Sequence, residues 1–158
     1  MIVGRYVSLC GFCVTLRPMN NITCPCCSGK PFGKCCEPYV SGKKKPVTVK
    51  QTMRARYTAY ALGDYGDYLF HTWHPQYRGG LTAKSLAQKT QNWTRLEVFE
   101  AKQVGDRAAI EFKAYYTDDK GVTQCHHEFS QFLRHKGRWF YTDGKVRMEE
   151  VPSVAAQA

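Results

Sequence analysis

Five of the eight cysteines in this 158-residue chain fall within thirteen residues, and this cluster constrains the fold more than any other feature. They are Cys24, Cys26, Cys27, Cys35 and Cys36. Structural zinc takes four soft ligands, such as thiolates, at about 2.3 Å in a tetrahedron, and two close groups of cysteines joined by a tight turn can supply them. Gly29 and Gly33 permit that turn, because glycine adopts backbone conformations that other residues resist. The cluster therefore favours a small metal-centred knuckle.

Disulfide bonding is the alternative interpretation of the same cysteines. The neighbours Cys35 and Cys36 cannot easily pair with each other, so each would need a partner across the loop. Disulfide-dense chains are usually small and secreted, and no small-x-small cleavage site follows the apolar stretch near the N-terminus. Lys30 and Lys34 place positive charge beside the thiols and favour the thiolate form. We interpret the cluster as a zinc site in a cytoplasmic protein, with disulfides or another metal as the alternatives.

The segment 24–36 resembles the SEC-C motif, the short zinc-binding element at the C-terminus of the translocase ATPase SecA and in many small bacterial proteins. The resemblance implies that the zinc ligands are Cys24, Cys26, Cys35 and Cys36. Cys27 stands where the motif has glycine, which leaves a spare thiol beside the metal.

The resemblance continues over about residues 22–145 to the YchJ family of bacterial proteins. The segments that carry it are 38–42, 53–60, 72–75 and 138–144. The family implies a nuclear transport factor 2-like (NTF2-like) cone, with three helices on a curved antiparallel sheet, preceded by the zinc knuckle. It does not imply a settled activity.

The chain accordingly divides into five predicted segments. Residues 1–18 form a dispensable or disordered extension, 19–42 the SEC-C-like knuckle, 43–47 a basic linker, 48–147 the NTF2-like domain and 148–158 a flexible tail. The extension contains a Cys-x-x-Cys pair, Cys10 and Cys13, but the residues after it are a poor helix start for a redox motif.

Local patterns independently predict helices followed by strands. Thr48-x-x-Gln51 is a capping box, and apolar residues then recur at helical spacing up to Gly63. Asp64 and Thr82 are expected to cap two further helices. Four strands with a period of two are expected near 94–104, 107–117, 122–135 and 138–143. This order indicates an α+β fold with the helices on one face of an antiparallel sheet.

Charge and hydropathy limit the partners. The formal net charge is +10, and Lys43, Lys44 and Lys45 follow the cysteine cluster directly. This basic run is either a contact surface for an acidic protein, a nucleic-acid phosphate or an anionic lipid surface, or simply a solvated linker. No apolar run approaches the roughly 18 residues that would cross a bilayer. A homodimer is a further expectation.

A pocket between helices and sheet is the second candidate site, lined by Arg54, Tyr57, His74, Glu128, Ser130 and Tyr141. Asp143 is a further polar candidate. Glu128 and Ser130 share one face of their strand, and Arg54 or Arg56 could neutralise the carboxylate. His74 and Glu128 then form either an acid–base pair or unrelated structural groups. Cys125-His126-His127 is interpreted as incidental, since adjacent strand residues point to opposite faces.

Two classes of function follow. The first is a zinc-binding adaptor that presents a basic knuckle, and it is the one that we prefer. The second is a small-molecule enzyme or ligand-binding protein that uses the cone. Four thiolates leave zinc without an open coordination position, so the metal is structural in both.

Overall fold

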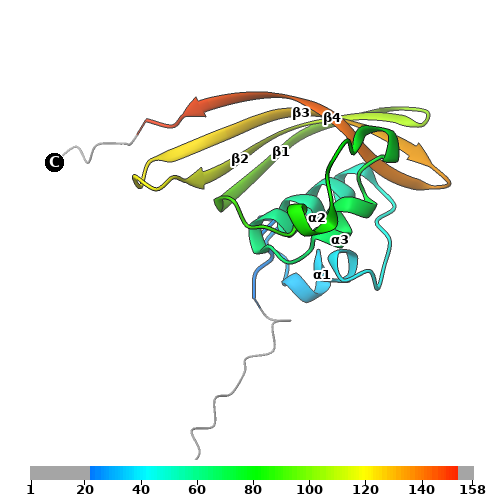
Figure 1. Ribbon diagram of the computed structural model, residues 1–158, viewed down its shortest axis with the longest axis horizontal. Coiled ribbons are helices and arrows are strands. Elements are labelled where there is room, and N and C mark those ends of the chain that lie inside the picture. The colour runs from blue at the N-terminus through cyan, green and yellow to red at the C-terminus, as the bar shows by residue number, and fades with distance from the viewer. Residues whose placement is uncertain (1–21, 153–158) are drawn as a thin grey trace, which may run out of the picture.

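A computed structural model describes residues 22–152, which form one antiparallel sheet with all helices on a single face (Figure 1). The elements are the 3₁₀ helices η2 (Phe32–Lys34) and η3 (Pro75–Tyr77), the helices α1 (Glu37–Val40), α2 (Val49–Leu62), α3 (Gly66–His71) and α4 (Ala83–Leu86), and the strands β1 (Asn92–Val104), β2 (Arg107–Thr117), β3 (Thr123–His135) and β4 (Arg138–Glu150). The predicted extension 1–18, with Cys10 and Cys13, lies outside the described residues.

Helix α2 is the central support of the helical layer. The predicted capping box begins it: the Gln51 amide donates to Thr48 Oγ1 at 3.2 Å, and the Thr48 amide donates to the Gln51 side chain at 3.2 Å. Gly63, with φ of 75°, ends the helix in a conformation that favours glycine. The predicted apolar face of the helix is buried at Val49 and Met53.

The second helix does not begin where the sequence predicts. Asp64 lies before α3, and Tyr65 stands at the N-cap without a side-chain hydrogen bond. Helix α3 starts at Gly66, whose backbone touches α4: a Cβ at Gly66 would lie 1.8 Å from the carbonyl oxygen of Ala83. Close packing between α3 and α4, rather than a polar cap, therefore fixes the start of α3.

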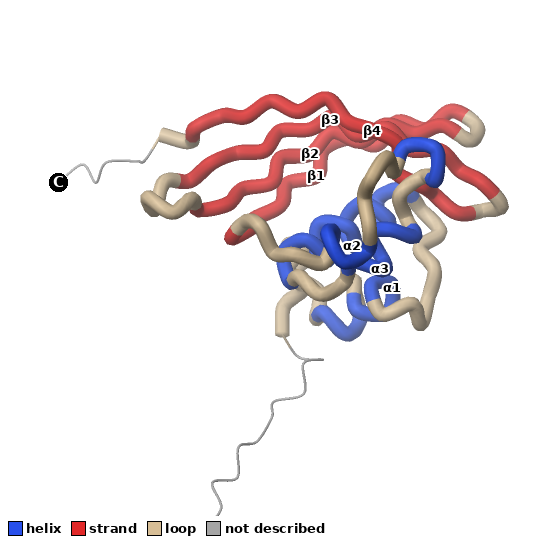
Figure 2. Tube along the Cα trace, viewed as in Figure 1, coloured by secondary structure: helices blue, strands red, loops and turns tan. Residues whose placement is uncertain are grey.

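The four strands follow one another in the order β1-β2-β3-β4, each antiparallel to the next. The sheet extends well past the helical layer on one side (Figure 2). β4 is longer than the predicted segment 138–143, because it pairs with β3 as far as Glu150 opposite Gln124. Residues 148–150 of the predicted tail therefore belong to the sheet. The register between β3 and β4 shifts between Ser130 and Phe132, an irregularity that increases sheet twist.

Within residues 22–152, one hydrophobic core includes side chains of both the cysteine segment and the cone. Phe32, between the two cysteine groups, is almost wholly buried and belongs to the same cluster as Met53 of α2 and Phe132 of β3. The knuckle is thus packed onto the helical layer through shared apolar side chains.

Candidate functional site

The sulfurs of four cysteines converge next to α2. The Sγ atoms of Cys24, Cys26, Cys35 and Cys36 all lie within 4.8 Å of one another. Cys26 Sγ lies 3.6 Å from Cys35 Sγ, which lies 3.9 Å from Cys36 Sγ. Four sulfurs placed about 2.3 Å from a tetrahedral zinc would be separated by about 3.8 Å. The cluster therefore has the spacing of a tetrahedral thiolate metal site.

Backbone turns hold this spacing. The Cys27 amide donates to the Cys24 carbonyl at 3.1 Å, and the Cys35 amide donates to the Phe32 carbonyl at 3.0 Å. Cys27 and Gly29 both have positive φ, of 58° and 75°, so the loop after the first cysteines turns through left-handed conformations. All six cysteines of the described chain are free thiols.

Neighbouring groups fasten the cluster to the cone. Arg54 Nη1 of α2 donates to the Cys26 carbonyl at 2.6 Å, and the Cys24 sulfur lies 3.9 Å from Thr58 Oγ1. The Leu96 amide of β1 donates to Cys27 Sγ at 3.4 Å. Arg54, predicted to line the pocket, therefore lies against the knuckle. Such outer contacts orient metal ligands.

Close contacts among the thiols shift their pKa values in opposite directions. Contact with Cys26 raises the pKa of Cys24 to about 11. The pKa of Cys36 is also raised, first by its contact with Cys24 and then by Cys26 and burial. The same contacts, first from Cys24 and then from Cys36, lower the pKa of Cys26. Thiols bind a metal in the deprotonated form, so a divalent cation that binds here would release protons.

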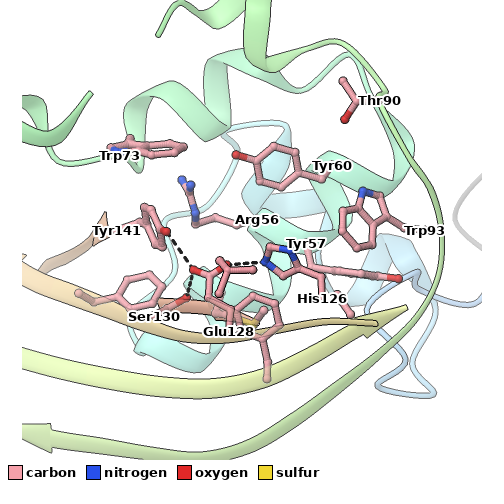
Figure 3. A pocket seen from close by; sticks show the side chains of 15 residues that line it. Arg56, Tyr57, Tyr60, Trp73, Thr90, Trp93, His126, Glu128, Ser130 and Tyr141 are labelled. Atoms are coloured by element: carbon pink, nitrogen blue, oxygen red, sulfur yellow. Dashed lines mark hydrogen bonds and ion pairs between the residues drawn. The ribbon is translucent and has the colours of Figure 1, made fainter. Parts of the chain in front are cut away.

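A cavity of about 340 Å³ lies between α2 and the sheet (Figure 3). Its aromatic walls are Tyr57, Tyr60, Trp73, Trp93, Phe112, Phe132 and Tyr141, and its polar groups include Arg56, Thr90, His126, Glu128 and Ser130. Small-molecule sites in proteins usually have about 300–1,000 Å³ and a mostly apolar lining with a few polar groups. The cavity has both properties.

Glu128 is the centre of a hydrogen-bond network on the cavity floor. Its Oε1 accepts from Ser130 Oγ at 2.7 Å and from the Tyr141 hydroxyl at 2.9 Å, and its Oε2 lies 2.7 Å from His126 Nε2 (Figure 3). Burial raises the pKa of Glu128, but these three hydrogen bonds outweigh burial and leave the pKa below its usual range. Burial and the nearby carboxylate raise the pKa of Tyr141. The carboxylate is thus ionised and the phenol is a donor at neutral pH.

The backbone of β4 leaves room for this carboxylate. A Cβ at Gly144, which lies opposite Ser130, would stand 2.1 Å from Glu128 Oε1. A side chain there would force the carboxylate out of its place, and the φ of Gly144 lies outside the left-handed region. Gly144 is therefore explained by space for Glu128 rather than by its backbone conformation.

Arg56 lies opposite this network on the helical wall. Its Nη1 donates to the Leu69 carbonyl at 3.0 Å and to Thr72 Oγ1 at 2.8 Å. Its guanidinium carbon lies 5.0 Å from the Trp73 ring centre and 4.7 Å from that of Tyr141, a cation–π geometry. Neither Arg56 nor Arg54 forms the proposed ion pair with Glu128, because Arg56 donates to neutral acceptors and Arg54 donates to the Cys26 carbonyl.

The structure brings together four of the six predicted pocket residues: Tyr57, Glu128, Ser130 and Tyr141. His74 is absent from the cavity lining. Its Nδ1 accepts from the Gln76 amide at 3.4 Å and caps η3, so of the two alternatives His74 and Glu128 are unrelated structural groups and not an acid–base pair. Asp143 is exposed. Position 74 follows α3 in a loop, whose side-chain directions the sequence does not fix.

His126 is the polar member of the Glu128 network that the sequence interpretation missed, and the aromatic wall residues Tyr60, Trp73, Trp93 and Phe112 were not predicted either. It stacks on Phe112 with ring centres 6.0 Å apart and reaches Glu128. Strand alternation was the available signal, because it places His126 on the same face as Glu128 and Ser130. His127 points the other way, to Glu111 and Glu149, as alternation predicts.

The basic run lies beside a second hollow of about 250 Å³ between the knuckle and the cone. Lys43 pairs with Glu37 at 2.6 Å. Lys44 and Lys45 line the hollow together with His71, Arg138 and one acidic residue, Asp67. Two of the three predicted lysines thus share a cationic groove with residues from α3 and β4.

No helix in residues 22–152 is long and apolar enough to span a membrane.

Comparison with known proteins agrees with the resemblance drawn from the sequence. Residues 48–144 match the family model described as the YchJ middle NTF2-like domain. A UPF0225 protein of Geobacter sulfurreducens is 37% identical over 131 residues, which cover 80% of each chain. A UPF0225 protein of Sodalis glossinidius is 40% identical over 130 residues, covering 77% of this chain and 82% of the relative.

A solved structure shares the fold. The solution structure of a SEC-C motif containing protein from Rhodopseudomonas palustris has a TM-score of 0.69 and 32% identity, covering 79% of this chain and 97% of the other. The expected NTF2-like domain with an antiparallel sheet is therefore confirmed, and the thiol cluster together with the SEC-C relative supports metal binding.

Proposed function

The chain belongs to the YchJ family, and from this premise we propose that it is a zinc-binding accessory protein of the bacterial cytoplasm. The observation that carries the proposal is the convergence of four sulfurs within 4.8 Å of one another. In this proposal Cys24, Cys26, Cys35 and Cys36 hold one zinc ion. An all-thiolate set favours zinc over harder cations such as magnesium or calcium.

The zinc has a structural role in this proposal. Four thiolates fill a tetrahedral site and leave no position for a substrate. The ion would fix the knuckle (19–42) and the basic linker (43–47) against the cone (48–147). Phe32 in the common core and the Arg54–Cys26 hydrogen bond support this role, because both join the two parts.

Elemental analysis of the purified full chain tests the zinc assignment, with Cys35→Ser as the variant and Cys27→Ser as the matched control. Cys27 lies in the same loop, but it is exposed and outside the four-sulfur cluster. One zinc per chain is expected in the parent and in Cys27→Ser, and a large loss in Cys35→Ser. Full zinc retention in Cys35→Ser would contradict the assignment.

We further propose that the cationic groove beside the basic run binds an acidic segment of a partner protein. Lys44 and Lys45 have no ion-pair partner among the described residues, and Arg138 adds a third cation to the same hollow. A hollow bounded by Tyr39 and Trp139 as well as by cations suits a polypeptide with acidic and apolar side chains better than a bare phosphate chain.

Affinity capture from nuclease-treated lysate tests this docking surface, using the parent, Lys44→Glu/Lys45→Glu and the control Lys84→Glu/Lys102→Glu. The groove variant should lose a salt-sensitive protein partner that the control retains, because exposed charges are screened over about 8 Å at physiological ionic strength. Equal capture by both variants would contradict the proposal. Capture of a partner only from lysate that was not treated with nuclease, or binding of the parent to anionic vesicles in place of a protein, would also contradict it.

The cone cavity supports a second candidate function, the binding of a small molecule. Its size, its aromatic walls and the partly buried His126–Glu128–Tyr141 network favour this candidate, with or without a chemical step. It does not compete with the first proposal, since Arg54 of α2 contacts the knuckle whereas Arg56 lines the cavity.

A further inference from the structure

We propose that the cone cavity binds a small organic acid, with its anionic group on Arg56 and a planar body between the aromatic walls. The inference deepens the second candidate function and rests on it, but it does not depend on the zinc or on the cationic groove.

Arg56 is a buried cation without a counter-ion. Its side chain belongs to a residue that is 6% exposed, and no ion pair among residues 22–152 includes it. Its two hydrogen bonds go to neutral acceptors, the Leu69 carbonyl and the Thr72 hydroxyl. An ion that leaves water without an opposite charge costs free energy, which an anion arriving beside it offsets. The site therefore favours a negatively charged group.

Part of the guanidinium is available to a ligand. Both hydrogen bonds use Nη1, and neither Nε nor Nη2 has a partner in the described part of the chain. Every buried side-chain nitrogen or oxygen atom of those residues has a hydrogen-bond partner. Because Nε and Nη2 have no partner, these two atoms are not fully buried and must reach open space. Arg56 lines the cavity, and that is the open space which its head group reaches. Adjacent guanidinium nitrogens bind a carboxylate through two parallel hydrogen bonds.

Glu128 does not make the cavity favour a cationic ligand instead. Its two oxygens already accept three hydrogen bonds, from His126, Ser130 and Tyr141, so its acceptor sites are largely occupied within the protein. Aromatic faces also attract cations, but Arg56 itself lies over the rings of Trp73 and Tyr141. The free hydrogen-bonding capacity among these two charged groups therefore lies on the cation, Arg56.

The remaining walls define the body of the ligand. Tyr57 and Trp93 meet edge to face with ring centres 6.1 Å apart, and Phe112 stacks on His126. Flat apolar side chains around about 340 Å³ suit one or two planar rings rather than a long chain or a sugar. An aromatic or cyclic monocarboxylic acid meets both requirements.

Three probes of nearly equal shape test the charge preference without any mutation: benzoate, benzamide and benzamidine, which carry negative, zero and positive charge. Binding to the zinc-loaded full chain is measured by calorimetry and by the fluorescence of Trp73 and Trp93, which line the cavity. Benzoate should bind at least about tenfold more tightly than benzamide, since charge-assisted hydrogen bonds are about twice as strong as neutral ones. Benzamidine should bind more weakly than either.

Arginine variants identify the residue that causes the preference for benzoate over benzamide. Arg56→Met should remove the advantage of benzoate over benzamide, whereas Arg56→Lys should keep part of it. Arg107→Met, on the exposed start of β2, is the control and should bind like the parent. The probe comparison on the parent protein keeps the proposal testable even if Arg56→Met fails to fold.

Each other outcome overturns the proposal. Tighter binding of benzamide or benzamidine than of benzoate would refute the anion site but leave the cavity as a ligand site. Binding of none of the three would refute both the inference and the second candidate function. A benzoate preference that persists in a folded Arg56→Met would assign the anion to another residue.

Discussion

Substitution of Gly144 by alanine should destabilise the cone through Glu128, although the two residues belong to different strands. The added Cβ would lie 2.1 Å from Glu128 Oε1, 2.7 Å from its Cδ and 2.8 Å from its Cγ. Ordinary carbon contacts need about 3.5–4.0 Å, so the carboxylate must move by about 1 Å or more. Such a shift breaks the hydrogen bonds of Oε1 with Ser130 and Tyr141, now 2.7 and 2.9 Å long.

The size of the expected loss in the free energy of unfolding follows from those two hydrogen bonds. Hydrogen bonds to a charged group contribute about 1.5–3 kcal/mol each, which gives about 3–6 kcal/mol for the pair. Water that enters the cavity can replace part of this, so we expect a loss of about 2–4 kcal/mol in the free energy of unfolding. Urea unfolding of the zinc-loaded, reduced protein measures the loss.

Two comparisons separate this cause from a general effect of alanine. Gly80→Ala is the matched control, because nothing lies within 4 Å of its added Cβ and its φ is also outside the left-handed region. It should change stability by less than about 0.5 kcal/mol. In a Glu128→Ala background, Gly144→Ala should lose most of its cost. Equal stabilities of Gly144→Ala and Gly80→Ala would show that the Glu128 contact is not the cause.

Three further perturbations probe other contacts. Arg54→Met should weaken zinc affinity by about 10–100-fold in chelator competition, because it loses the bond to the Cys26 carbonyl, whereas Lys50→Met should not. Phe32→Ala should cost about 3–5 kcal/mol in urea unfolding of the whole domain, because this ring lies in the common core. The folded pKa of Glu128 is below its ordinary value of 4.5, so its stabilisation is present above that pH and is lost as pH falls through the folded pKa. Glu128→Gln should therefore flatten the stability–pH profile below about pH 4.5, and an unchanged profile would contradict the network.

Local signals predicted the elements that short-range physics controls. The capping box at Thr48 and the glycine at 63 marked both ends of α2, and strand alternation indicated β2 at 107–117. These features depend on neighbours within one turn or one strand. The end of β4 depended on pairing with β3 instead, and the charged residues around Val146 carry little strand signal of their own.

The candidate sites also differ in whether local sequence or long-range packing determines them. The cysteine cluster is local in sequence, so its spacing alone was enough to indicate a metal site. Strand alternation alone was sufficient to place His126 on the same face as Glu128. The position of His74 depends on how its loop packs against the sheet, and no local pattern indicated that His74 lies away from Glu128. Arg54 and Arg56 stand two positions apart on α2, and only the packing of the helix assigns one to the knuckle and the other to the cavity.

X-ray absorption at the zinc edge of the purified full chain is the decisive test of the metal assignment. We expect one zinc per chain with four sulfur neighbours at about 2.3 Å. A site with two or fewer sulfurs, with nitrogen or oxygen in their place, or a chain that is purified under reducing conditions without zinc and does not take it up, would contradict the claim that Cys24, Cys26, Cys35 and Cys36 form a structural zinc centre.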